Sequence, residues 1–394
     1  MLKCQMTVID IVIIFRHNCG IFLSLQISSG VRRTCIHGLL IKGFTQRMQA
    51  HFFQHPTRAD ISQWRLWLSG NADVHYFQHP YFAQAFSESH HYQHQWLVVM
   101  RDGKWIATLA WVLMREKKFM FSYATTRAVV YGGPVFLPGL SQTDKEACMD
   151  IALEGLIKTT KSKSLYIQFR NFYETEPYAQ IFTRHGFVFS ERLNLIKAIP
   201  NREKALMEMS PSRRRQVKLS RTNGLVVRSA ASISEVDELY DLLRKLYRKK
   251  VRKPLIAKTV LHGFFKQSAA GNSGTVLVAQ YKDRIVGGII APFTPGDTIF
   301  EWYVCGLDKH LKQDKVYPTV ALTWAAMEAG MEQGCHHFDF MGMGIPGRPY
   351  GVRDFKARFG GEWVNYGRWM RINHPRTYKS VELAYNLLRL MKKV

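Results

Sequence analysis

Acidic residues are scarce in this chain: 30 Asp and Glu stand against 55 Lys and Arg in 394 residues, a formal net charge of +25. An excess of this size attracts anionic partners such as phosphates, nucleic acid or acidic membrane, without choosing among them. Cysteine is scarce as well, and the six residues have no paired spacing, so we expect no disulfide framework. No C-x-x-C or H-E-x-x-H motif accompanies Cys335-His336-His337, so we expect no zinc site.

Long apolar runs are also missing. Residues 1–47 contain two short runs separated by Arg16 and His17, and neither approaches the roughly 18 apolar residues that a membrane span requires. Asp10 before the first run, and the lack of a small-residue cleavage site after the second, make a poor secretory signal. We therefore expect residues 1–50 to be a disordered extension and the protein to be cytoplasmic.

What the chain does contain is a pattern of elements that occurs twice. Residues 96–113 predict a β-hairpin with its turn at Asp102-Gly103, and residues 275–293 predict another with a turn near Lys282-Asp283. In each half a β-rich run, a helical pattern, a short strand and a helix ending at glycine follow in the same order.

This order predicts an α/β (α+β) fold in which each copy is a mixed, mostly antiparallel sheet flanked by helices. The expected domains are 55–200 and 201–375, followed by an amphipathic helix over 376–394.

The join between the halves is the most basic stretch. Residues 201–260 contain sixteen Lys and Arg against six Asp and Glu. Ser210-Pro211 is a good helix start, which would put Arg213–Arg215 in the first turn, where the helix dipole disfavours cations. A bound phosphate would relieve this conflict, although a solvated basic face explains the cluster equally well.

A glycine-rich loop, Gly342-Met343-Gly344-Ile345-Pro346-Gly347, follows a predicted strand. Its letters fit G-x-G-x-x-G, but a dinucleotide-binding loop opens directly into a helix, and Pro346 and Pro349 remove amide donors. We interpret the stretch as a loop where backbone approaches a ligand closely. The chain contains no G-x-S-x-G or G-x-x-x-x-G-K-[ST] motif.

The run HHFDFMGMGIPGRPYGVRDFKARFGGE, residues 336–362, resembles the closing block of the FemAB family: a strand with an aspartate, a glycine-rich loop and an F-K-x-x-F-G helix. Residues 317–334 and the basic run 212–224 also resemble that family, so the likeness covers about 210–365 well and 75–200 weakly. The resemblance implies two tandem GNAT-like domains of the GNAT superfamily. It also implies an aminoacyltransferase that moves an amino acid from aminoacyl-tRNA to an amine of a peptidoglycan precursor, without a cofactor.

Aminolysis of an activated ester requires an oriented amine and a stabilised oxyanion. By resemblance, Lys356 matches the lysine of the F-K motif, where a cation suits an oxyanion or a phosphate. Asp339 could accept the amine proton through water if burial raises its pKa, or it could only bind the loop amides of Gly342 and Gly344. The other expected substrate-binding residues are Arg213, Arg214, Arg215, Lys218, Gly342, Gly344, Gly347, Arg348, Tyr350, Arg353 and Arg358.

Two departures from related proteins bear on the acyl donor. Some FemAB members carry a long helical hairpin that is thought to engage tRNA, whereas Ser232–Lys253 predicts one ordinary helix. Neither half contains the R/Q-x-x-G-x-G/A loop with which GNAT acetyltransferases hold coenzyme A pyrophosphate, and this absence favours aminoacyl-tRNA over acetyl-CoA.

Two alternatives stay open. One is an acyl-CoA-dependent N-acyltransferase of envelope polysaccharide or lipid biosynthesis, and the other is a non-catalytic binder of an anionic polymer. The expected partners are aminoacyl-tRNA, a peptidoglycan or other anionic envelope precursor, and anionic membrane at its inner face.

Overall fold

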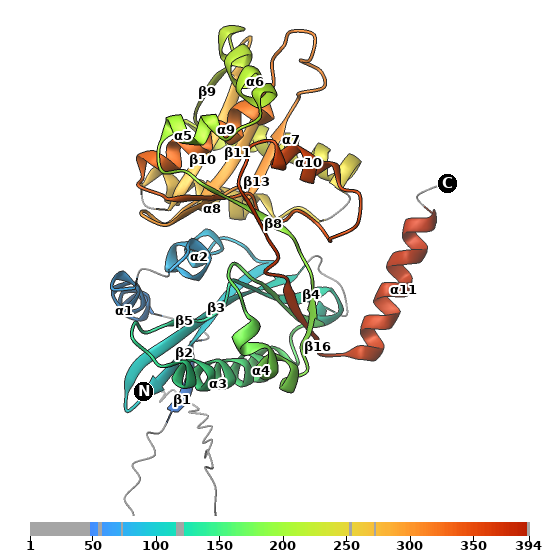
Figure 1. Ribbon diagram of the computed structural model, residues 1–394. Helices are drawn as coiled ribbons and strands as arrows, with labels where there is room; N and C mark the ends of the chain where they lie inside the picture. Colours follow the sequence, from blue (N-terminus) through green and yellow to red (C-terminus); the bar gives the residue numbers. More distant parts are fainter. Residues whose placement is uncertain are drawn as a thin grey trace, which may run out of the picture.

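The computed structural model describes residues 48–391 apart from 54–56, 72–73, 116–121, 252–253 and 272. They form two lobes, one above the other, and the chain passes between the lobes more than once (Figure 1). The extension predicted over residues 1–50 lies outside the described residues as far as residue 47. From Met48 onward the chain already belongs to the first lobe, because residues 48–53 pair along their whole length with residues 96–101.

The first lobe is built on one eight-stranded sheet with the order β1-β2-β3-β4-β6-β16-β7, and β5 pairs with β3. Helices α3 and α4 lie on the side away from the second lobe, and α1 and α2 lie on the side facing it (Figure 1). The strands are β1 (Met48–Phe53), β2 (Tyr92–Arg101), β3 (Lys104–Arg115), β4 (Thr126–Tyr131), β5 (Val135–Phe136), β6 (Tyr166–Arg170), β7 (Val188–Ser190) and β16 (Arg368–Ile372). The helices are α1 (Arg58–Ser69), α2 (Pro80–Ala85), α3 (Gln142–Thr160) and α4 (Ala179–Arg184), with 3-10 turns at Tyr76–Gln78, Ser122–Thr125 and Glu176–Tyr178.

The second lobe contains two four-stranded sheets, ordered β13-β11-β10-β9 and β12-β14-β8-β15. Its strands are β8 (Asn194–Ala198), β9 (Val226–Ser229), β10 (Gly274–Tyr281), β11 (Arg284–Pro292), β12 (Thr298–Phe300), β13 (Tyr303–Gly306), β14 (His337–Asp339) and β15 (Glu362–Val364). Its helices are α5 (Arg202–Met207), α6 (Pro211–Thr222), α7 (Ile233–Leu246), α8 (Lys258–Ala269), α9 (Pro318–Glu332) and α10 (Gly351–Ala357), and Tyr247–Val251 adds a π-helical turn after α7.

The repeat predicted from the sequence is confirmed. The two hairpins are β2–β3 and β10–β11, and their turns place Asp102, Gly103, Lys282 and Asp283 at positive φ, as tight hairpin turns require. In each lobe the strand after the hairpin then pairs in parallel with the short strand that follows the long helix, β4 with β6 and β12 with β14. The architecture is therefore two mixed α/β domains in tandem.

The two domains exchange one strand each. Strand β8 follows β7 in the chain but pairs between β14 and β15 of the second lobe. Strand β16 follows β15 but pairs between β6 and β7 of the first lobe. The expected ranges 55–200 and 201–375 thus each give a strand to the other lobe, and residues 191–193 and 365–367 are the two crossings.

A shared apolar cluster joins the lobes besides these crossings. Phe77 and Phe82 of the first lobe pack in one buried cluster with Leu239 of α7 and Phe264 of α8. Helices α2 and α8 come so close that a Cβ on Gly263 would lie 2.4 Å from the Ala85 carbonyl oxygen. Burial of aromatic rings from both sides stabilises one arrangement of the two lobes.

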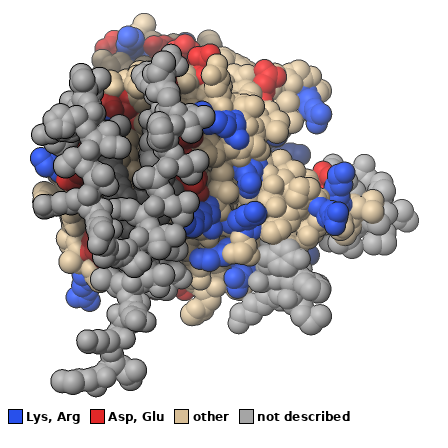
Figure 2. All heavy atoms as spheres, turned by 90° about the horizontal axis from the view of Figure 1, so that it is seen from below, with Lys and Arg blue, Asp and Glu red and all other residues tan. Residues whose placement is uncertain are grey.

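The C-terminal helix predicted over 376–394 is observed as α11 (Pro375–Met391), which projects away from both lobes (Figure 1). Within the part of the chain that the structure describes, none of the helices combines the length and apolar character needed to cross a membrane. Lys and Arg side chains are spread over the face of the molecule seen in Figure 2, so the basic excess is not confined to one patch there.

Candidate active site

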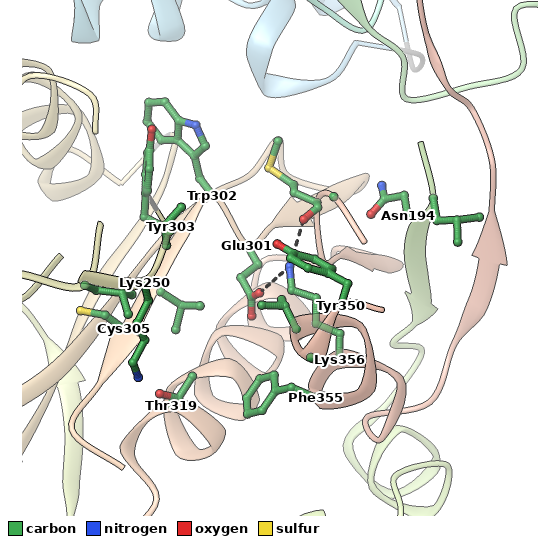
Figure 3. Close-up of a pocket in the computed structure, with 18 of the residues that line it drawn as sticks. Asn194, Lys250, Glu301, Trp302, Tyr303, Cys305, Thr319, Tyr350, Phe355 and Lys356 are labelled. Carbon is green, nitrogen blue, oxygen red and sulfur yellow. Dashed lines mark hydrogen bonds and ion pairs between the residues drawn. The ribbon is translucent and has the colours of Figure 1, made fainter. Parts of the chain in front are cut away.

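A cavity of about 1000 Å³ lies between the lobes, and both strand crossings form part of its wall. The second lobe contributes β13, the start of α9 and helix α10, and the first lobe contributes the end of β6 (Figure 3). The crossing segment at Leu193 is tied to the glycine-rich loop by two backbone hydrogen bonds, one to Gly344 and one from Met343. The strand exchange therefore places residues of both domains around one space.

Lys356, predicted to be catalytic, lines this cavity from α10 and is 7% exposed. Its ammonium donates to the carbonyl oxygens of Phe340 and Met341, the latter at 2.9 Å, and Nζ lies 3.1 Å from Glu301 Oε1. Met341 reaches this position with φ at 48°, a strained value for a residue with a side chain. To contact an oxyanion, the ammonium has to exchange one of these acceptors for the substrate.

Glu301 is a cavity residue that the sequence analysis missed. It lies at the break between β12 and β13, is 3% exposed, and accepts a hydrogen bond from Thr323 Oγ1 at 3.0 Å. In Figure 3 its carboxylate meets the Lys356 ammonium beside the Tyr350 ring. A buried carboxylate is stable only with such partners, so Glu301 and Lys356 act as a pair. The signal in the sequence was a single charge inside the apolar run IFEWYVC.

Asp339, at the end of β14, is 2% exposed. Its Oδ1 accepts hydrogen bonds from Asn194 Nδ2 at 2.7 Å and from the Met341 amide at 2.6 Å. Burial raises the pKa of this carboxyl to about 6, against the lowering effect of those two bonds and of Lys356. The amide that Asp339 binds is thus that of Met341, whereas the alternative considered above named Gly342 and Gly344.

The glycine-rich loop contributes unequally to the cavity. Gly342 and Tyr350 line it, whereas Gly344, Gly347 and Arg348 are absent from its wall. Arg353 does not line it either, and it holds the loop from outside by donating to the carbonyl oxygens of Met343 and Ile345. Gly344 lies at positive φ, and a Cβ there would lie 3.1 Å from the Tyr350 ring, so the loop packs tightly on the start of α10.

The basic residues at the start of α6, Arg213–Arg215 and Lys218, also differ in whether they reach the cavity. Ser210 caps this helix and Pro211 opens it, as predicted. Arg213 alone of the cluster lines the cavity, 6% exposed, with its guanidinium over the Phe355 ring and a hydrogen bond to the Phe355 carbonyl oxygen. Burial, together with the neighbouring Arg358, lowers the Arg213 pKa to about 10.

The remaining basic residues of the prediction do not reach the cavity. Arg214 donates to the carbonyl oxygens of Leu206, Met207 and Met209, and so caps the C-terminus of α5. Arg215, Lys218 and Arg358 are exposed and lie outside the cavity wall. The Arg214 guanidinium therefore binds the end of a helix inside the protein rather than a phosphate.

Three arginines on the first-lobe side were not predicted: Arg170, Arg192 and Arg368. Burial, together with repulsion by Arg170 and Arg192, lowers the Arg368 pKa to about 9. No carboxylate and no hydrogen-bond acceptor among the described residues pairs with the Arg368 guanidinium. Crowded cations without an internal counterion form a site for an anion.

The N-terminus of α9 is already occupied by a carboxylate. Asp308 accepts hydrogen bonds from the Thr319 amide at 3.2 Å and from the Thr319 hydroxyl. A Cβ on Gly306 would lie 2.9 Å from the same carboxylate, so the turn before the helix is tightly packed. Asp308 therefore already occupies the Thr319 amide and hydroxyl at this terminus, where an external phosphate would otherwise bind.

Comparison with known proteins agrees with this architecture. The sequence family described as Acetyltransferase (GNAT) domain matches residues 211–357, and no curated protein matches the chain significantly. A crystal structure of FemX is similar at a TM-score of 0.59 with 12% identity, covering 85% of this chain and 100% of that one. A tandem GNAT protein from the clavulanic acid biosynthesis pathway is similar at a TM-score of 0.51 with 10% identity, covering 83% and 98%.

The domain match agrees with the predicted enzyme class, an acyltransferase. The two solved structures share only 12% and 10% sequence identity with this chain, so their similarity concerns the fold alone. The chain has the FemAB-like tandem GNAT fold predicted from its closing block, and residues 211–357 match the GNAT acetyltransferase domain.

Proposed function

We propose that the protein is an aminoacyltransferase that moves an amino acid from aminoacyl-tRNA to an amine of a peptidoglycan precursor or a similar cell-envelope acceptor. The observation that carries this proposal is the charge of the interlobe cavity. Seven basic residues line it against two acidic ones, Glu301 and Asp308, and both of these are engaged with protein groups. A cavity of this kind suits a donor rich in phosphate.

The state of α9 supports tRNA over coenzyme A as the donor. A helix N-terminus is a ready site for a pyrophosphate, and the N-terminus of α9 lies at the interlobe cavity. Asp308 at that terminus would repel a pyrophosphate, and the turn before the helix lacks the glycine-rich motif. The arginines of the first-lobe side offer the donor phosphates a different place to bind.

In the proposed reaction the acceptor amine attacks the ester carbonyl of the aminoacyl group. A carbon–nitrogen bond forms, the carbon–oxygen bond to the ribose breaks, and the amine proton ends on the ribose hydroxyl. Lys356 supplies positive charge where the oxyanion develops, once one of its present acceptors is exchanged. Asp339, with its pKa raised to about 6, takes up the amine proton.

A binding experiment separates the donors. Charged tRNA retained on filters should bind with an affinity that falls steeply as salt rises, because several phosphates are neutralised. Titration with acetyl-CoA should show no saturable heat. Tight acetyl-CoA binding with weak, non-saturable tRNA retention would reject the proposed donor.

The second candidate is an acyl-CoA-dependent N-acyltransferase of envelope polysaccharide or lipid biosynthesis, which the GNAT acetyltransferase match favours. The third is a non-catalytic binder of an anionic polymer, which the basic cavity alone would satisfy. Mass spectrometry of mixtures containing charged tRNA or acetyl-CoA with candidate amines decides among the three. The acyl group found in an amide product identifies the donor. Binding without any product supports the non-catalytic binder of an anionic polymer.

We also place the enzyme in the cytoplasm, where charged tRNA is available. Contact with the inner face of the membrane would bring it to a lipid-linked precursor, and its basic surface favours anionic lipid.

A further inference from the structure

A second cavity, of about 630 Å³, lies beside the first and is also walled by both lobes. The first lobe contributes residues 134–139, 172–174 and 177–178 together with His75 and Lys145, and the second lobe contributes Ile196, Asp297, Thr298, Phe300 and Asp339. Phe172 lines both cavities. The proposed function leaves this space without an occupant.

The charge of the second cavity is opposite to that of the first. Its charged wall residues are Glu174, Asp297 and Asp339 against Lys145. His75 adds no charge near neutral pH, because complete burial lowers its pKa to about 3. The remaining wall is largely apolar and aromatic, with Phe136, Phe172, Tyr173, Tyr178 and Phe300 among its members. Acidic groups on an apolar wall fit a cationic head on an aliphatic chain.

Asp339 lies between the two cavities. Asn194 and Met341, whose side-chain and backbone amides bind its Oδ1, line the basic cavity, while Asp339 itself lines the acidic one. No described residue donates to Oδ2 of this carboxylate, although the residue is 98% buried. A carboxylate oxygen at a cavity wall without a protein donor can accept a hydrogen bond from a ligand.

Two more polar atoms of this wall have no partner among the described residues, His75 Nδ1 and Tyr173 Oη. Gly132 and Gly133 allow these side chains to sit where they do, since a Cβ on either glycine would lie 2.1 Å from His75 Nε2 or Tyr173 Oη. The wall is thus built around polar groups that the protein alone does not satisfy.

We infer that the second cavity binds the acceptor, a primary amine on an aliphatic chain, with its nitrogen at Asp339 Oδ2. This inference rests on the proposed function, because it assigns the acceptor of the same reaction. The amine reaches the donor ester from the acidic side of Asp339 while the phosphates of the donor remain on the basic side. The bound ammonium first releases one proton to solvent and so becomes the nucleophile. Asp339 then receives the second proton from the nitrogen as the amide bond forms and returns it to the departing ribose oxygen.

The test uses the full chain and hexylamine as the probe, with hexanoate and hexanol as the charge-reversed and neutral analogues. Titration should show saturable hexylamine binding and no comparable binding of hexanoate. Glu174→Lys should weaken hexylamine binding by at least about fivefold, since a reversed charge in the wall of the same cavity opposes an ammonium. Glu176→Lys is the matched control: it makes the same charge change two residues away, also at an exposed position, but outside both cavity walls.

Equal hexylamine affinity in the two lysine variants, or preferential binding of hexanoate, would overturn the inference. So would transfer to an alkyl amine whose acceptor KM is unchanged by Glu174→Lys, and in that case the proposed function would stand. Selective amine binding without any transfer from charged tRNA would instead reject the proposed function and leave the amine site in place. Thermal unfolding of both variants controls for folding.

Discussion

The Lys356 ammonium has little freedom, since two carbonyl oxygens and the Glu301 carboxylate surround it. We expect Lys356→Met to lower kcat by about 10²–10³ in the transfer reaction, the usual cost of losing one oxyanion stabiliser. Methionine keeps most of the length of the lysine side chain, so by shape alone this variant should fold normally. The buried ion pair changes that expectation, because an unpaired Glu301 should lower the free energy of unfolding by about 3–5 kcal/mol. Turnover and urea unfolding are the measurements.

The double variant Lys356→Met with Glu301→Gln separates the two effects. Removing both charges should recover most of the stability but none of the turnover, because a neutral pair leaves no buried charge unpaired. A single Lys356→Met variant with full kcat and only a changed KM would show that Lys356 is a binding contact.

At Asp339 the raised pKa makes a prediction about stability. The folded state holds this proton up to about pH 6 and the unfolded state only up to its ordinary pKa of 3.8, so the free energy of unfolding falls as pH rises between these values. Asp339→Asn keeps an acceptor for Asn194 and the Met341 amide and removes the charge. It should therefore be more stable than the native protein by up to about 3 kcal/mol near pH 7.5 and equally stable near pH 4.

Urea unfolding at both pH values checks this, with transfer activity as the second readout. A variant that loses activity while gaining stability at neutral pH is the expected result. A variant equally destabilised at both pH values would mean that the carboxylate serves the fold.

Single residues were predictable where a motif enclosed them. Asp339 and Lys356 stand at fixed places in a block with a recognisable order, and the structure places both beside the interlobe cavity. Glu301 lies at the break between β12 and β13 and Arg368 begins β16, and the neighbours of both in space come from other parts of the chain. Charge at such a position is visible in the sequence, but its partner is not.

At the scale of elements, α6 contains arginines with two different tasks. The sequence placed Arg214 and Arg215 among the expected substrate-binding residues. Because Arg214 caps α5, we now expect Arg214→Gln to lower the free energy of unfolding by about 1 kcal/mol and to leave tRNA affinity unchanged. Arg368→Gln should weaken charged-tRNA binding by about tenfold and reduce the salt slope by about 1.

Filter binding across a salt series with both variants gives the comparison. A larger loss of tRNA affinity in Arg214→Gln than in Arg368→Gln would return the phosphate contact to the start of α6.

Hairpins and long helices were predictable because their determinants are local. Local determinants depend only on residues a few positions away along the chain. Examples are the turn at Asp102-Gly103, the cap at Ser210 and the apolar periodicity of residues 318–332. The partners of β8 and β16 depend on strands far away in the chain, and the pattern NLIKA would suit either sheet. The sheet of the first lobe is complete only when β16 inserts into it. The sheet β12-β14-β8-β15 of the second lobe is complete only when β8 inserts into it.

The whole molecule should unfold as one unit in spite of its two domains. Each lobe contains a strand from the other, and aromatic side chains of both form one buried cluster. We expect a single calorimetric transition whose calorimetric and van't Hoff enthalpies agree. Deletion of residues 365–391, which removes β16, should unfold the first lobe as well as shorten the chain. Two separate transitions in the intact protein, or a truncated chain with native far-UV and near-UV circular dichroism, would contradict this.

The strand exchange also sets an order of events during synthesis. When the ribosome has completed residues 48–190, the first sheet still has a gap between β6 and β7, which β16 fills only after residue 372 is made. Until then two strand edges of the nascent chain are open to wrong partners, β8 of the same chain included. The enzyme can close its first lobe only after most of its second lobe has left the ribosome, so translation and assembly of the cavity finish together.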